Sequence, residues 1–62
     1  MDRYKVTISV TTKLGIETFV YHNIYENDIL QAGLAGEELA ISELKQRGIR
    51  PTHISASVVL CE

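Results

Sequence analysis

The side chains that come closest to a nucleophilic or metal site in this sequence are Cys61, His22, Asp28 and His53. A thiol beside a histidine and an aspartate is the arrangement of an activated cysteine nucleophile. We expect Cys61, His22 and Asp28 at one end of a sheet, but their spacing enforces no contact and a penultimate residue is poorly held. His53 is expected at the opposite end, and one cysteine with two histidines falls short of a structural zinc site. The sequence therefore predicts neither a catalytic site nor a metal site.

A glycine-containing segment, Gly33-Leu34-Ala35-Gly36, is the nearest match to a phosphate-binding loop. Such a loop follows a strand, has wider glycine spacing and usually carries a lysine. Here Glu37 and Glu38 follow directly, and two carboxylates repel a phosphate. The segment instead indicates helix initiation or close packing of a helix on a sheet, and no cofactor is expected. Glu37 and Glu38 belong either to a solvated helix face or to an acidic docking surface for a basic partner.

Composition limits what kind of protein this is. Ile, Leu, Val and Phe make 19 of 62 residues and the formal net charge is −2, which indicates one small folded domain over residues 1–62. No apolar run is long enough for a membrane span, and the N-terminus has no signal-peptide pattern. A mildly acidic balance is not the charge of a nucleic-acid-binding surface. One cysteine, expected to be reduced, favours a cytoplasmic location.

Two segments predict strands joined by a turn. Residues 4–11 alternate apolar with polar side chains, and β-branched residues are frequent among them, which is typical of a half-buried strand. Residues 12–15 read as a turn, and residues 16–22 follow as an antiparallel partner strand. In this second strand we expect Ile16, Thr18 and Val20 to face the core. Phe19 and Tyr21 then point the other way with Glu17.

A helix and a third strand complete the chain. Asn27 or Asp28 is expected as the N-cap of a helix that ends at Arg47, with Gly48 as its C-terminal stop. Gly33 and Gly36 lower helix propensity, so the position of the helix start is left open, as late as Leu34 or Ala35. Residues 54–61 again alternate, which predicts a strand.

This order predicts an α+β fold, a two-layer β-β-α-β arrangement with a three-stranded antiparallel sheet in the order 2-1-3 and the helix on one face. A sheet with the third strand beside the second is the alternative. The expected core comprises Tyr4, Val6, Ile8, Val10, Ile16, Val20, Ile54, Ala56, Val58 and Leu60 of the sheet under Leu30, Leu34, Ala40, Ile41 and Leu44 of the helix.

One helix leaves the second face of the sheet uncovered. On that face we expect serines and threonines together with an aromatic pair and one valine. The face could be simply solvated, could bind a second copy, or could bind nucleic acid by stacking on the aromatic pair. The candidate interface residues are Thr7, Ser9, Phe19, Tyr21, Ser57 and Val59.

No motif identifies a family. The order of elements is loosely similar to small antitoxin-like and phage-encoded domains, which favours a phage or mobile-element origin, but no diagnostic residue carries the similarity. A domain this small encloses a substrate pocket with difficulty. We therefore expect a non-enzymatic interaction protein that forms a homodimer through the helix-free face or an edge strand. A nucleic-acid-binding module is the alternative.

Overall fold

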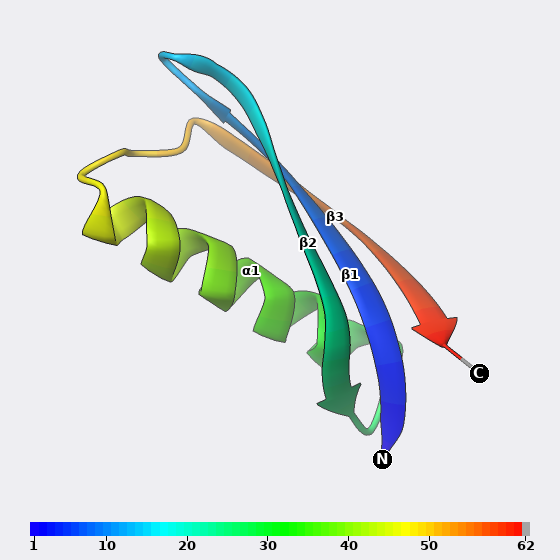
Figure 1. The fold of residues 1–62 in the computed structure, drawn as a ribbon. Coiled ribbons are helices and arrows are strands. Elements are labelled where there is room, and N and C mark those ends of the chain that lie inside the picture. Colours follow the sequence, from blue (N-terminus) through cyan, green and yellow to red (C-terminus); the bar gives the residue numbers. More distant parts are fainter. Residues whose placement is uncertain (62) are drawn as a thin grey trace.

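The computed structural model describes residues 1–61, which form three strands and one helix. The elements are β1 (Asp2–Thr12), β2 (Gly15–Glu26), α1 (Ile29–Gln46) and β3 (His53–Cys61). β1 lies between β2 and β3 and pairs antiparallel with both, while α1 covers one face of the sheet (Figure 1). The predicted α+β fold with strand order 2-1-3 is confirmed, and the alternative with β3 beside β2 is wrong.

The β1–β2 hairpin turns through the two residues Lys13 and Leu14, between the paired residues Thr12 and Gly15. The Thr12 hydroxyl accepts a hydrogen bond from the Leu14 N–H at 3.1 Å and donates one to the Gly15 carbonyl at 3.3 Å. Gly15 has a φ of 127°, a conformation that side chains with a Cβ rarely adopt. The Thr12 hydroxyl and the flexible backbone of Gly15 therefore favour this two-residue turn.

β2 is longer than predicted, because it continues past His22 to Glu26. The pairing with β1 shifts between Tyr4 and Val6, whose partners are Ile24 and Tyr21. Three steps along β2 thus match two steps along β1, which is a β-bulge. The bulge returns Ile24 to the helix side, where it is buried.

The helix begins at Ile29, and its N-cap is Asp28, whose carboxylate accepts from the Gln31 N–H at 2.8 Å. Both Gly33 and Gly36 therefore lie inside the helix, and the late start that their low propensity suggested is wrong. The reason at Gly36 is packing, since a Cβ there would stand 2.5 Å from Val6 Cγ1. Close packing of helix on sheet, one of the two expectations for this segment, is confirmed.

The helix ends as the sequence predicts. Gly48 has a φ of 72°, its N–H donates to the Lys45 carbonyl at 3.1 Å, and the Ile49 N–H donates to the Leu44 carbonyl at 2.9 Å. These two bonds form a Schellman motif, which satisfies carbonyls that the helix end leaves free. Within the described residues, α1 is not long and apolar enough to cross a membrane.

The core lies between β1 and α1. Its buried members are Tyr4, Val6, Ile8, Val10, Ile24, Ala32, Ala40 and Leu44, with Ile54 and Val58 partly buried against them. Ile24 and Ala32 were absent from the expected core. Seven residues expected in the core are instead exposed, namely Ile16, Val20, Leu30, Leu34, Ile41, Ala56 and Leu60. The small residues Ala32, Gly36 and Ala40 let the helix sit directly over β1, and its larger apolar side chains remain at its margin.

Candidate functional site

The predicted interface does not form a single surface. Thr7, Ser9, Ser57 and Val59 do share the helix-free face of the sheet, because residues directly opposite in the register lie on the same face. Phe19 pairs with Ile8 and Tyr21 with Val6, so both aromatics lie on the helix side and pack against the core. The predicted orientation of Phe19 and Tyr21 was wrong because the two-residue turn, not the apolarity of Ile16, sets the register of β2.

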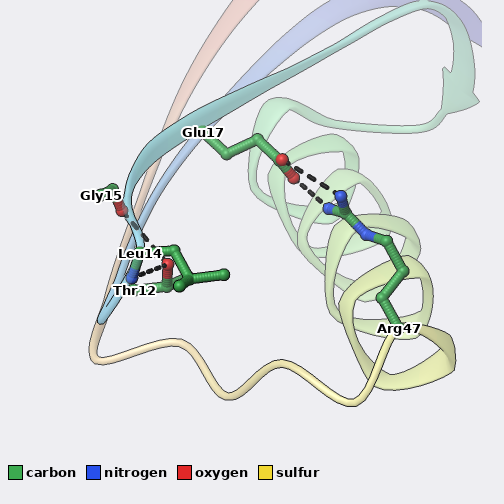
Figure 2. Close-up of polar contacts among 5 residues, drawn as sticks. All are labelled: Thr12, Leu14, Gly15, Glu17 and Arg47. Carbon is green, nitrogen blue, oxygen red and sulfur yellow. Dashed lines mark hydrogen bonds and ion pairs between the residues drawn. The ribbon is translucent and has the colours of Figure 1, made fainter.

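On the helix side of β2, the end of α1 contacts the strand near the hairpin, beside a hollow of about 280 Å³ lined by Tyr21, Leu39, Ser42, Glu43 and Gln46. The Arg47 guanidinium donates to both carboxylate oxygens of Glu17, one bond being 3.2 Å between Nη1 and Oε1 (Figure 2). The same guanidinium lies 5.8 Å from the centre of the Phe19 ring. These hydrogen bonds hold the pKa of Glu17 below its ordinary value, although partial burial opposes the shift. The sequence prediction placed Glu17 on the helix-free face with Phe19 and Tyr21, which is wrong, so its role as a partner of Arg47 was missed.

The helix side of β3 is open. Between α1 and β3 runs a groove of about 350 Å³, which we call the β3 groove; it is lined by Ile29, Leu30, Gly33, Leu34, Glu37, Ala56 and Val58. Leu30 is 73% exposed and Leu34 is 49% exposed, and Leu60 of β3 is 48% exposed beyond the groove. Exposed apolar side chains of two elements thus gather along one side of the molecule. Sequence reasoning missed this surface because it placed Leu30, Leu34 and Leu60 in the core.

β3 is also an edge strand, and its backbone groups on one side have no neighbouring strand. Antiparallel ladders alternate, so that successive residues direct N–H and C=O to opposite sides. Thr11 faces β3, because its carbonyl accepts from both the N–H and the hydroxyl of Thr52, at 2.8 and 3.0 Å. Continuing the alternation along the register directs the backbone groups of alternate β3 residues away from the sheet; these are Ile54, Ala56, Val58 and Leu60.

The titratable residues considered from the sequence lie on β2 (His22), on β3 (His53 and Cys61) and at the N-cap of α1 (Asp28). Among residues 1–61, no group of three histidine, cysteine, aspartate or glutamate side chains could hold a metal ion. Cys61 is a free, half-buried thiol opposite Arg3, whereas His53 pairs with Thr11 at the hairpin end. The Asp28 carboxylate is used as the helix cap.

The two acidic helix residues are placed differently from one another. Glu37 is half-buried at the margin of the β3 groove, whereas Glu38 is exposed. A basic partner for this pair stays a prediction. Glu37 is the charged residue that lines the β3 groove, so a partner in that groove would meet a mainly apolar surface with one carboxylate.

A hollow of about 640 Å³ lies where the β1–β2 turn meets the connection from α1 to β3. Lys13 and Arg50 line it together with Leu14, Ile49 and Pro51. No polar or charged side chain is buried in the part of the chain that the structure describes. The polar side chains that line this hollow, those of Lys13, Arg50 and Thr52, are exposed, so none is held by burial in the way that orients a small ligand.

The helix-free face does not carry the predicted aromatic pair, on which the expected stacking of nucleic-acid bases rested. The aromatic residue opposite Arg3 is Tyr25, which is 55% exposed. One aromatic offers one stacking platform, whereas single-strand binders use successive ones.

No family model, curated protein or solved structure matches this chain.

Proposed function

We propose that this protein is a small, non-enzymatic interaction protein that binds a second copy of itself through edge strand β3 and the β3 groove. The observation that carries the proposal is the coincidence of unpaired strand backbone with exposed apolar side chains along one side of the molecule. Either feature alone is common, but together they offer both main-chain hydrogen bonds and apolar burial to an added strand.

The sequence of β3 supports this choice of surface. His53–Cys61 contains no Asp, Glu, Lys, Arg, Pro or Gly, and its pairing with β1 runs without a shift from Arg3 to Thr11. Edge strands of monomeric proteins usually carry charges, prolines or bulges that prevent another strand from pairing. β3 has none of these devices.

The accessible surface of the chain supports a partner as well. Monomeric proteins of 6.9 kDa are expected to expose about 4,000 Å². This chain exposes 4444 Å². An interface of standard size covers about 800 Å² on each partner, which is less than a fifth of that surface. Such an interface would therefore cover a minor part of the exposed surface.

A second copy is the occupant we favour because the edge is self-complementary. An antiparallel strand pair can be symmetric, so the same uncharged strand serves on both sides of the interface. A cytoplasmic location fits the proposal, since Cys61 is a free thiol and the cytosol keeps thiols reduced.

Sedimentation equilibrium of matched variants tests the proposed function. Leu60 and Val20 are 48% and 45% exposed, each on an edge strand, so lysine at either position should be tolerated by the fold. Leu60→Lys places a charge at the β3 surface and should weaken dimerisation at least about a hundredfold, a loss of about 2.7 kcal/mol. Val20→Lys should leave dimerisation unchanged.

Circular dichroism of both variants serves as the control for folding. A wild-type protein that sediments as a monomer up to millimolar concentration would overturn the proposal. Equal weakening by Val20→Lys would also count against it, because the interface would then include the helix-free face or β2.

A further inference from the structure

We infer that the two copies join as an antiparallel β3–β3 pair about a two-fold axis at Ser57, which makes one continuous six-stranded sheet from two three-stranded ones. This inference rests on the proposed function and specifies its geometry. It follows from which backbone groups of β3 are free and from which side chains a symmetric register brings together.

The free backbone groups of β3 decide which of its residues can lie opposite one another in the pair. Ile54, Ala56, Val58 and Leu60 direct their N–H and C=O outward, and the residues between them bond to β1. A symmetric antiparallel pair must place outward-directed residues opposite one another to form its hydrogen bonds. With Ser57 opposite the partner's Ser57, all four outward-directed residues find such partners.

The same register matches apolar side chains on the helix side. Ile54 lies opposite the partner's Leu60, and Ala56 lies opposite the partner's Val58, in both directions by symmetry. A slip of two residues that centres the pair on Ala56 would leave Leu60 opposite the partner's Thr52, beyond the end of the strand. The register centred on Ser57 pairs the whole of His53–Cys61.

The helices then flank the joined strands on one face. A two-fold axis perpendicular to the sheet keeps both copies of α1 on the same side of it. Leu30 and Leu34 line the β3 side of α1, and Ile41, which is 41% exposed, lies two helical turns beyond Leu34 on the same flank. These side chains of the two copies therefore face each other across the four apolar pairs of the joined strands.

The other surfaces fit a second copy less well. β2, the opposite edge, carries Glu17 and Glu26 and is interrupted by its bulge. The helix-free face presents mainly hydroxyl side chains, including Thr7, Ser9 and Ser57. Neither surface combines an uninterrupted edge with an apolar groove.

Disulfide cross-linking tests the register. In the Cys61→Ser background, Ser57→Cys places a thiol opposite its own copy in a non-hydrogen-bonded pair, where Cβ atoms lie about 4.5–5.5 Å apart, close to disulfide geometry. Mild oxidation should convert this variant to a covalent dimer. Ser55→Cys is the matched control, because its copy lies four residues further along, about 13 Å away at 3.3 Å per residue.

We expect Ser57→Cys to cross-link at least about tenfold faster than Ser55→Cys, and Leu60→Lys to abolish the difference. A sedimentation dimer in which Ser57→Cys fails to cross-link, or in which Ser55→Cys cross-links faster, would overturn this register and leave the proposed function standing. A monomer in sedimentation together with equal slow cross-linking would overturn both.

Discussion

The two edges of the sheet carry similarly exposed apolar residues but differ in how they are protected. Val20 on β2 is 45% exposed and Leu60 on β3 is 48% exposed. β2 has a bulge, two glutamates and the Arg47–Glu17 contact that joins it to the end of the helix. β3 has an uncharged, uninterrupted edge beside a groove. The difference shows that exposure alone does not identify an interaction surface, and that the unprotected backbone beside it does.

The two helix glycines offer the largest test of this asymmetry. Gly36 lies over β1, where a Cβ would stand 2.5 Å from Val6 Cγ1, whereas a Cβ at Gly33 would stand 3.4 Å from Val58 Cγ2 on β3. Gly36→Ala should destabilise the fold by about 1–3 kcal/mol through overpacking, partly offset by about 1 kcal/mol of helix propensity. Gly33→Ala should be neutral or stabilising by up to about 1 kcal/mol.

Urea denaturation at one fixed protein concentration measures both variants under the same association conditions. The ranking is the informative result. If Gly33→Ala destabilised the fold as much as Gly36→Ala, the helix would pack as tightly over β3 as over β1. The β3 groove would then offer no room to a partner.

The contact between α1 and β2 should make the stability of the fold depend on pH through Glu17. Folding lowers the pKa of this carboxyl below its ordinary value of 4.5 because Arg47 donates hydrogen bonds to it. The resulting stabilisation is therefore present above the unfolded-state pKa and is lost as pH falls through the folded-state pKa. Its size should be small, because the pair is exposed to solvent.

Denaturation of the wild type and Glu17→Gln at pH 7 and pH 3 checks this expectation. The wild type should be the more stable at pH 7, and the two should converge at pH 3. A difference that stayed constant with pH would mean that packing or uncharged hydrogen bonding of residue 17, rather than its charge pair with Arg47, is what stabilises this contact.

Much of the fold could be predicted from the sequence because local signals were strong. The alternation of Tyr4, Val6, Ile8 and Val10 identified the central strand, and Gly48 marked the end of the helix. Strand order followed, since an antiparallel hairpin and a returning helix leave few arrangements.

The side-chain orientation of β2 could not be predicted from its composition. Both faces of β2 carry apolar residues, so its pattern does not choose between Ile16 and Phe19 as core positions. The turn chooses, because pairing Thr12 with Gly15 places Phe19 opposite Ile8. The exposed flank of α1 was missed for a related reason. A broad apolar arc shows that a helix is buried on one side, but only Gly36 against Val6 shows which part of that arc meets the sheet.

Amide hydrogen exchange measured at increasing protein concentration compares the two edges most directly. The outward amides of β3, at Ile54, Ala56, Val58 and Leu60, should exchange fast at low concentration and become protected as dimers form. Continued from the Thr12–Gly15 pair, the same alternation leaves the amides of Ile16, Thr18 and Val20 as the outward ones on β2. These should stay fast at every concentration. Protection that appeared on β2, or on neither edge while the protein dimerised, would contradict the assignment of β3 as the surface of self-association.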